Sequence, residues 1–240
     1  MMKPLYKRVL IKLSGEALMG QQGFGIERKA CDLIAQSIKE VHDLGVEIGI
    51  VVGGGNIFRG VQAEEFGFAR TPADQIGMLA TTMNGLILQQ SLSILGVFSI
   101  VMSSLTDSFT EKYNWTRCLE AVQKKKIVIF VGGTGNPYFT TDTAAALRAV
   151  EIQADIVMKA TKVDGIYTDD PQKNPLAKKY EQLTYLEALS KKLNVMDATA
   201  IALCRENHLP IYVFSLFQKG SLLSAICHRR GGTLVTGEIT

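Results

Sequence analysis

The sequence predicts an α/β fold, a three-layer αβα sandwich with a mainly parallel central sheet. Segments rich in β-branched residues alternate along the chain with segments of helical periodicity, a pattern typical of parallel strands joined by helices. Residues 127–131, IVIFV, are apolar without interruption, as expected of a strand buried on both faces. With 240 residues and 47% hydrophobic content, the chain can bury a large core. We therefore expect one domain that spans residues 1–240.

The first predicted strand covers residues 7–13, KRVLIKL. Its β-rich pattern stops at Ser14 and Gly15, where a turn can place Lys12 and two backbone amides at the carboxyl end of the strand. Ligands of open α/β sheets bind at this end of the strands. The turn is therefore a candidate anion site.

A loop, a helix and a second strand are expected next. The glycines of residues 20–25, GQQGFG, predict a mobile loop before the first helix. Apolar residues recur at helical spacing over residues 27–44, and Gly45 follows as a typical residue just beyond a helix end. Residues 46–52, VEIGIVV, predict the second strand.

Three consecutive glycines, residues 53–55, follow the second strand. Each glycine weakens local order, so close approach of the backbone to a ligand explains them better than packing does. Arg59 lies within reach of the same turn, and its guanidinium group can bind a phosphate bidentately. The alternative for Arg59 is an ordinary surface arginine.

Residues 73–95 predict a long helix that is apolar over much of its circumference. Such a helix is either deeply buried or part of a subunit interface. Asp74, expected in its first turn, either favours the helix dipole or accepts hydrogen bonds from a ligand hydroxyl.

The remaining segments continue the alternation of strand and helix. In order, we expect a strand at 97–102, a helix at 114–123, a strand at 127–131, a helix from Thr143, a strand at 155–159, helices at 184–193 and 197–207, a strand at 211–214, a helix after Gly220 and a strand at 233–235.

The turn at residues 132–142, GGTGNPYFTTD, joins a buried strand to a helix. Three glycines in four residues can adopt positive φ and expose their N–H groups, and the Thr-Thr-Asp run can cap the helix. Unpaired amides and the helix dipole then form an anion site. The alternative is a tight connection with ordinary caps. Asp142 either caps the helix, orients Lys12 or helps to hold Mg²⁺.

Composition excludes several classes of protein. The four cysteines lie far apart without a CxxC pair, and the three histidines lack HExxH spacing, so neither a disulfide framework nor a metal site is indicated. A net charge of +3 favours small anionic ligands over a nucleic acid. The apolar runs are too short to span a bilayer, and the start shows no signal-peptide pattern. We expect reduced, packed cysteines, a cytoplasmic location and no membrane partner.

Several predicted strand ends combine a glycine turn with a nearby cation. Lys159 and Lys162 bring two further positive charges to the end of another strand. Repeated anion sites on one sheet edge predict two phosphorylated ligands or one with several phosphates, which favours phosphoryl transfer. No GxxxxGK[ST], HRD or DFG motif occurs, and Phe58 and Tyr138 interrupt two near-matches to the dinucleotide fingerprint. A phosphate acceptor, with a second pKa of about 6, needs no general base at pH 7.

Four motifs in order carry a family resemblance: KLSGEA (12–17), GGGNIFRG (53–60), GTGNPYFTTD (133–142) and KATKVDGIYTDDP (159–171). Together they resemble the amino acid kinase superfamily and, within it, the bacterial uridylate kinases. These enzymes transfer the γ-phosphoryl group of ATP to UMP, giving UDP and ADP, in pyrimidine nucleotide biosynthesis. The match covers nearly the whole chain, and the ordered set is highly specific.

The resemblance implies roles for individual residues. The catalytic positions of the family match Lys12, Arg59 and Asp142. The resemblance implies that Lys12 stabilises charge on the transferred group and that Asp142 orients Lys12. The positions that match the ATP site are Lys12, Leu13, Ser14, Gly15, Gly55, Arg59, Thr161, Tyr167 and Asp170. Those that match the UMP site are Gly54, Asp74, Thr134, Gly135, Asn136, Pro137, Tyr138, Phe139, Thr140 and Thr141. Those that match a loop associated with GTP activation are Gly20, Gln21, Gln22, Gly23, Phe24 and Gly25.

The resemblance further implies Mg²⁺ bound through the ATP phosphates, a homohexamer, activation by GTP and inhibition by UTP. The chain departs from the family at Gln21 and Gln22 and over residues 99–115. One alternative is a kinase of the same fold that phosphorylates a carboxylate or carbamate, as glutamate, aspartate and carbamate kinases do. Another alternative is a nucleotide-binding module without catalytic activity. Such a module is disfavoured because the chain contains Lys12, Arg59 and Asp142.

Overall fold

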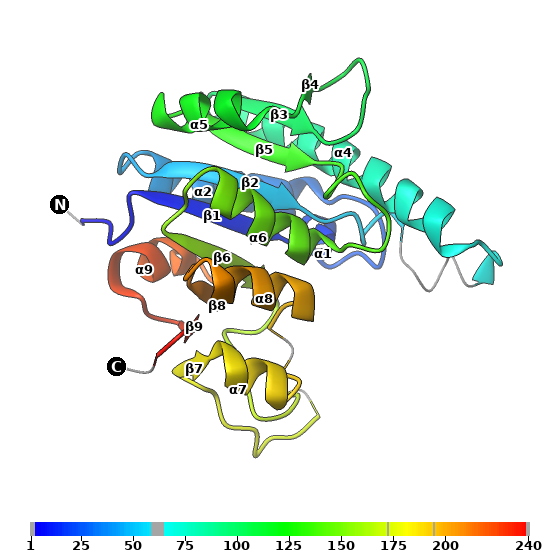
Figure 1. Cartoon of the computed structure of the whole chain (residues 1–240). Coiled ribbons are helices and arrows are strands. Elements are labelled where there is room, and N and C mark those ends of the chain that lie inside the picture. The colour runs from blue at the N-terminus through cyan, green and yellow to red at the C-terminus, as the bar shows by residue number, and fades with distance from the viewer. Residues whose placement is uncertain (1–2, 59–64, 172, 194, 239–240) are drawn as a thin grey trace.

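The structure, a computed structural model, describes residues 3–58, 65–171, 173–193 and 195–238. In this part of the chain, nine strands form one sheet with helices on both faces, which confirms the predicted α/β class (Figure 1). The strands are β1 (Arg8–Leu13), β2 (Glu47–Val52), β3 (Ser99–Ser103), β4 (Glu111–Lys112), β5 (Ile127–Val131), β6 (Ile156–Thr161), β7 (Gln182–Thr184), β8 (Ile211–Ser215) and β9 (Gly232–Thr236). The helices are α1 (Gly15–Met19), α2 (Arg28–His42), α4 (Arg70–Ile94), α5 (Trp115–Gln123), α6 (Thr141–Glu151), α7 (Tyr185–Ser190), α8 (Ala198–Glu206) and α9 (Ser221–His228).

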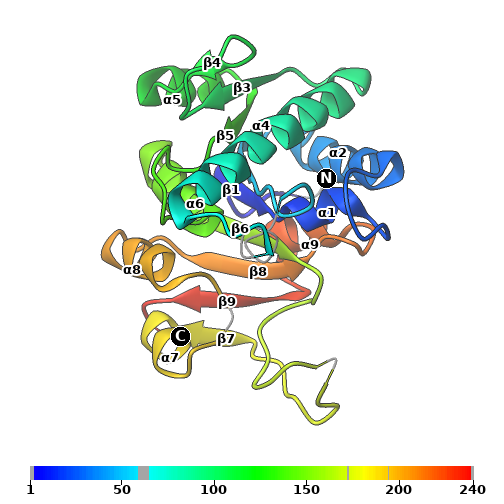
Figure 2. The same ribbon diagram turned by 90° about the vertical axis from the view of Figure 1, so that its right-hand side faces the viewer.

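The strand order is β4-β3-β5-β2-β1-β6-β8-β9-β7, and the ladders are parallel except for the antiparallel pair β8 and β9. In register, Leu13 of β1 lies beside Val52 of β2 and Ala160 of β6. The carboxyl ends of these central strands are therefore level. They point to the right in Figure 1, and Figure 2 views the molecule from that side.

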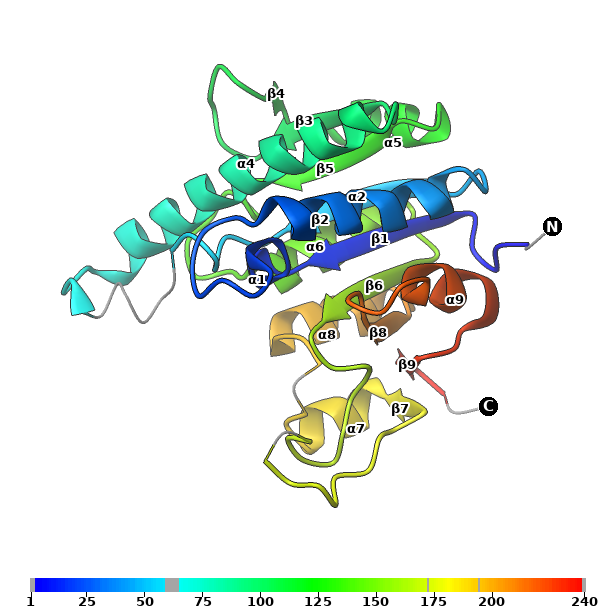
Figure 3. The ribbon, with the colours of Figure 1, turned by 180° about the vertical axis from the view of Figure 1, so that it is seen from behind.

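Two apolar clusters fill the space between the sheet and its two helical layers. One joins the inner faces of α1, α2, α4 and α9 to one side of the sheet, the layer nearest the viewer in Figure 3. The other joins α5, α6, α7 and α8 to the opposite side. Strands β1, β2 and β5 are buried along their whole length because both faces are covered. The four cysteines are free and buried, as expected.

The structure differs from the expected elements in a few places. Helix α1 follows β1 directly, where we expected a turn and then a loop, because a five-residue helix is too short for apolar periodicity to reveal it. Helix α4 begins at Arg70 rather than residue 73, so Asp74 lies beyond the first turn. Pro72 is tolerated there because the first N–H groups of a helix have no partner within it. The short strands β4 and β7 carried no sequence signal.

None of the helices in the described part of the chain combines the length and the apolar character needed to cross a membrane.

Candidate active site

Two lysines and one carboxylate meet at the carboxyl ends of the central strands. Lys12 on β1 pairs in register with Lys159 on β6, so the two side chains extend from neighbouring strands. The Lys12 Nζ atom lies 2.7 Å from Oδ1 of Asp142, and the Lys159 Nζ atom lies 2.9 Å from Oδ2. One carboxylate therefore bridges two lysines whose side chains are almost entirely buried.

The charges of this cluster are strongly coupled. Burial alone would raise the pKa of Asp142, but the adjacent charges of Lys12 and Lys159 outweigh it and hold that pKa below its usual range. Burial lowers the pKa of Lys159, and the neighbouring charge of Lys12 lowers it further, while Asp142 opposes both effects. With all three groups ionised, the cluster keeps one excess positive charge. A buried positive charge at this edge favours an anionic ligand.

The position of Asp142 is set by the start of α6. The Thr140 side chain caps this helix by accepting a hydrogen bond from the Asp142 N–H at 3.0 Å, so the alternative that Asp142 itself is the cap is wrong. Thr140 and Thr143 both donate hydroxyl hydrogen bonds to Asp197, the N-cap of α8. Asp197 was expected only as the start of a helix, so its link between α6 and α8 was not predicted.

The first glycine turn, residues 53–55, packs against the start of α1. The Gly53 N–H donates to the Leu13 carbonyl at 2.8 Å. A Cβ atom on Gly15 would lie 2.3 Å from the Asn56 side-chain oxygen and 2.9 Å from the Gly55 nitrogen, so only glycine fits. The loops after β1 and β2 therefore touch backbone to backbone.

Packing explains Gly53 and Gly54, contrary to the prediction that a ligand explains all three glycines. A Cβ atom on Gly53 would lie 3.0 Å from the Gly15 nitrogen. A Cβ atom on Gly54 would lie 2.6 Å from the Gly77 carbonyl oxygen of α4. A Cβ atom on Gly55 would meet none of the described atoms within 4 Å, so packing against this part of the chain does not require glycine there. Close approach of a ligand remains the better account for Gly55 alone.

Two buried asparagines support this turn from beneath. The side chains of Asn56 and Asn84 donate to each other at 3.1 and 2.7 Å. Asn84 also donates to the Gly53 carbonyl at 2.7 Å, and Asn56 donates to the Gly25 carbonyl at 2.9 Å. This amide pair connects the turn to α4 and to the end of the loop at residues 20–25. The sequence did not indicate it.

The second glycine turn has the backbone that the sequence predicted. Gly132, Gly133 and Gly135 all have positive φ, and the Gly132 N–H donates to the Thr81 hydroxyl of α4 at 2.7 Å. Tyr138 also has a positive φ of 73°, an unfavourable value for a bulky residue. Its N–H donates to Oδ2 of Asp74 at 2.7 Å.

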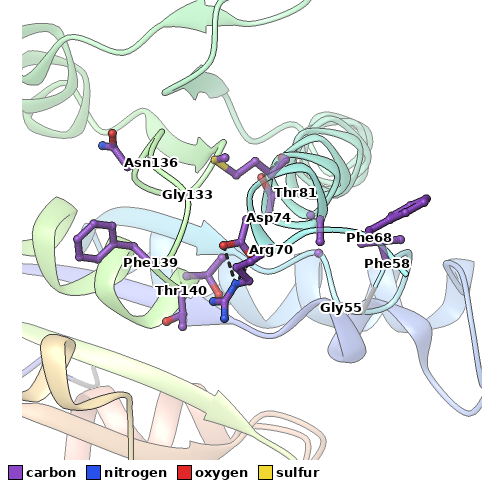
Figure 4. Close-up of a pocket in the computed structure, with 15 residues that line it drawn as sticks. Gly55, Phe58, Phe68, Arg70, Asp74, Thr81, Gly133, Asn136, Phe139 and Thr140 are labelled. Atoms are coloured by element: carbon purple, nitrogen blue, oxygen red, sulfur yellow. Dashed lines mark hydrogen bonds and ion pairs between the residues drawn. The ribbon is translucent and has the colours of Figure 1, made fainter. Parts of the chain in front are cut away.

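A cavity of about 490 Å³ opens between α4 and the two glycine turns (Figure 4). The residues predicted for UMP that line it are Gly54, Asp74, Asn136, Phe139, Thr140 and Thr141. The other four predicted for UMP, which do not line it, are Thr134, Gly135, Pro137 and Tyr138. Gly55, predicted for ATP, lines it, as do Phe58, Phe68 and Arg70, which were not assigned to the site.

A second cavity, of about 550 Å³, lies beyond the end of β6. Thr161, Tyr167 and Asp170, all predicted for ATP, line it together with Lys159. The Tyr167 hydroxyl donates to Asp164 at 2.6 Å, and that bond raises the Tyr167 pKa. Lys159 borders this second cavity, and Thr140 and Thr141, next to Asp142, border the first. The two cavities therefore approach each other at the cluster of Lys12, Asp142 and Lys159.

The remaining predicted residues fall into three groups. Leu13 is buried and Ser14 half-buried at the junction of β1 and α1. The loop at residues 20–25 leads from α1 toward α2, and the Gly25 N–H donates to the Asn56 carbonyl at 2.8 Å. Arg59, predicted to be catalytic, lies outside the described residues.

The described residues contain no group of three histidine, cysteine, aspartate or glutamate side chains suited to a metal ion. Asp142 has both oxygens in ion pairs with lysines, which disfavours it as a ligand of Mg²⁺. A Mg²⁺ ion bound through phosphate oxygens fits this arrangement, since the nearby protein cations would contact other phosphate oxygens.

The sequence and the fold place the chain among known proteins. A model of the Amino acid kinase family matches residues 7–215. A uridylate kinase of Protochlamydia amoebophila (strain UWE25) is 56% identical over 237 residues, covering 97% of this chain and 94% of that protein. A uridylate kinase of Colwellia psychrerythraea (strain 34H / ATCC BAA-681) is 49% identical over 235 residues, covering 98% of this chain and 95% of that protein.

Solved structures agree with the sequence relatives. The crystal structure of UMP kinase from Bacillus anthracis matches with a TM-score of 0.93 and 41% identity, covering 98% of this chain and 97% of that one. The crystal structure of UMP kinase from Ureaplasma parvum matches with a TM-score of 0.91 and 37% identity, covering 98% of this chain and 100% of that one. The motifs, the fold and these relatives lead to one conclusion: the chain belongs to the amino acid kinase family and, within it, to the uridylate kinases.

Proposed function

We propose that this chain transfers the γ-phosphoryl group of ATP to UMP, giving UDP and ADP. The observation that carries the proposal is the pair of cavities that approach each other at Lys12, Asp142 and Lys159. Two nucleotides in these cavities would direct their phosphates toward a cluster with an excess positive charge. The uridylate kinase relatives support UMP as the acceptor.

On the donor side, the ATP phosphates are held in this proposal by the residues at the ends of β1 and β2: Lys12, Leu13, Ser14, Gly15, Gly55 and Arg59. Thr161, Tyr167 and Asp170 contact the adenine and ribose. Mg²⁺, held by the ATP phosphates, supplies further neutralisation of charge when it is bound.

The chemistry requires positioning rather than a general base. An oxygen of the UMP phosphate, already ionised at neutral pH because its second pKa is about 6, attacks the γ-phosphorus. The bond to the oxygen that bridges the β- and γ-phosphates breaks, and that oxygen leaves with ADP. Lys12 stabilises the charge on the transferred group, and Asp142 holds Lys12 in place.

On the acceptor side, Asp74 accepts hydrogen bonds from the ribose hydroxyls of UMP. Gly54 and the residues from Thr134 to Thr141 surround the rest of the nucleotide. The whole chain acts as one domain with both nucleotides along one sheet edge, in the cytoplasm and in pyrimidine nucleotide synthesis.

We also propose a homohexamer regulated by GTP and UTP. Helix α4 exposes an apolar stripe that includes Leu79, Met83 and Ile94, the last of which is 78% exposed. The spacing of these residues places them along one side of the helix, so a second copy of the chain can cover them. The loop at residues 20–25 contacts Asn56 through Gly25, which gives an effector at that loop a route to the phosphate turn.

The experiment that tests the function is ADP release from Mg-ATP with a panel of acceptors: UMP, CMP, dUMP, AMP, glutamate, aspartate and carbamate. We expect turnover with UMP that greatly exceeds turnover with the carboxylates. The Lys12→Met variant serves as the control for contaminating kinases. Activity on glutamate, aspartate or carbamate without activity on UMP would replace the proposal with the carboxylate or carbamate kinase. Silence across the panel, with and without GTP, would favour a binding module.

A further inference from the structure

Asp74 is contacted from two sides at the mouth of the 490 Å³ cavity. The Arg70 Nε–H is shared between the two carboxylate oxygens, at 2.9 Å from Oδ1 and 2.8 Å from Oδ2. The Tyr138 N–H donates to Oδ2 at 2.7 Å. An ionised carboxylate offers about four acceptor positions, and these contacts use three of them. One position on Oδ1 remains for another donor.

Arg70 also contacts the second glycine turn, at Tyr138. Its guanidinium carbon lies 5.5 Å from the centre of the Tyr138 ring, within the range of a cation–π interaction. Arg70 and Asp74 belong to α4, whereas Tyr138 belongs to the second glycine turn. The three residues therefore form a closed set of contacts between α4 and the second glycine turn. Figure 4 shows the contact between Arg70 and Asp74.

Helix stability does not account for this arginine. Arg70 is the first residue of α4, where the positive end of the helix dipole disfavours a cation. Its side chain is 57% exposed, and exposed ion pairs between residues four apart contribute little to stability. The consequence of the pair is the orientation that it gives to the Asp74 carboxylate.

We propose that Arg70 is a positioning residue for the sugar of the acceptor nucleotide. By holding Asp74 from one side, Arg70 fixes the carboxylate so that its remaining acceptor position meets a ribose hydroxyl. The inference rests on the proposed function, because it assigns the sugar of the acceptor to this cavity. Arg70 acts through Asp74 and need not touch the nucleotide.

The test compares UMP with 2′,3′-dideoxy-UMP, which lacks both sugar hydroxyls. Steady-state kinetics with UMP give kcat and KM, and calorimetric titration gives Kd for both nucleotides. The variants are R70Q, R70K, D74N and R70Q/D74N. The matched control is K39Q, which removes the cation of the pair between Lys39 of α2 and Asp43, the residue just after that helix; these two residues are also four apart.

We expect R70Q to raise KM and Kd for UMP about tenfold, as for the loss of one charge-assisted hydrogen bond, and to change kcat by less than about threefold. Kd for dideoxy-UMP should stay unchanged. R70Q/D74N should bind UMP no more weakly than D74N, because both changes remove one interaction. R70K, which keeps the charge without the planar group, should recover part of the affinity. K39Q should match the wild type.

Three results would overturn the role of Arg70. Equal weakening of UMP and dideoxy-UMP would place Arg70 on the phosphate or the base instead. Unchanged UMP binding in R70Q, or additive effects of R70Q and D74N, would separate Arg70 from Asp74. Failure of the proposed function can be told apart from failure of this inference. If the wild-type protein does not phosphorylate UMP, the proposed function is wrong. If the wild type phosphorylates UMP and R70Q has the same KM and Kd for UMP, only the positioning role of Arg70 is wrong.

Discussion

The two glycine turns of the site follow neighbouring strands, yet different kinds of contact hold them. The turn at residues 53–55 rests on Asn56 and Asn84, which are 1% and 0% exposed. The far end of the turn at residues 132–138 depends on Asp74 and on Tyr138, which is 67% exposed. Water competes for the contacts of the second turn but is excluded from those of the first.

This difference assigns separate tasks to the two sides of the site. In the proposed function, the buried side, which includes Lys12, Asp142 and Lys159, is built before any ligand arrives and should determine the rate of transfer. In the same proposal, the open side, which includes Asp74 and Tyr138, can adjust to the acceptor and should determine selectivity. Changes on the buried side should therefore affect kcat and stability, and changes on the open side should affect affinity for the acceptor.

The largest effect is expected from Lys12→Met. Removing a preorganised donor to the transferred group should lower kcat about 100- to 1,000-fold, while Kd for UMP stays nearly constant. Steady-state kinetics together with calorimetric titration of UMP measure the two quantities. The Lys39→Met variant, at a half-buried lysine of α2, provides the control. An equal loss of rate and of UMP affinity would contradict the division between the two sides.

A smaller effect is expected from Asn84→Leu. The change removes the hydrogen bonds that Asn84 donates to the Gly53 carbonyl and to the Asn56 side-chain oxygen, which should lower the free energy of unfolding by about 1–3 kcal/mol. Urea unfolding at fixed protein concentration measures this loss.

The matched control for this variant is Thr82→Val on the same helix. The Thr82 hydroxyl is buried and has no hydrogen-bond partner in the described part of the chain, so its removal should be neutral or stabilising. Equal destabilisation by the two variants would show that the amide pair does not support the turn.

The smallest effect concerns pH. Burial lowers the pKa of Lys159 below its ordinary value, so this lysine loses its proton earlier than exposed lysines as pH rises. We expect kcat to fall on the alkaline side, at a lower pH than that at which exposed lysines lose their protons. The charges of Lys12 and Lys159 hold the pKa of Asp142 below its usual range, so Asp142 stays ionised on the acid side. There the acceptor phosphate should limit the rate near a pH of about 6.

Lys159→Arg tests the assignment of the alkaline limb, because arginine keeps its charge and should move that limb upward. Lys162→Arg, at a lysine that is 51% exposed and paired with Glu16, should leave the limb in place. An alkaline limb that is identical in wild type and Lys159→Arg would exclude Lys159 as its source.

Much of the fold could be predicted from local patterns. The apolar run of β5 and the helical spacing of α2 identify both elements because burial dictates their composition. The short elements α1, β4 and β7 could not be predicted, because a few residues carry no periodicity and their position depends on tertiary contacts. The start of α4 at Arg70 was missed because the first apolar residue, not the cap, guided the prediction.

The candidate site could be predicted in part, through residues whose role depends on neighbours in the chain. The positive φ of Gly132, Gly133 and Gly135 followed from sequence, since only glycine adopts it readily. The contacts of Asn84, Asp197 and Arg70 depend on residues that are distant in the sequence or across a turn. No local pattern distinguishes these side chains from ordinary helix residues.

The measurement that tests the contrast between the two turns most directly is amide hydrogen exchange with and without UMP. The Gly53 and Ile57 amides, bonded to Leu13 and Gly54, should exchange slowly in the free protein and change little when UMP is added. The Gly135 and Tyr138 amides should exchange faster in the free protein and slow markedly with UMP. Equal exchange at the two turns in the free protein, or protection by UMP confined to the first turn, would contradict the account.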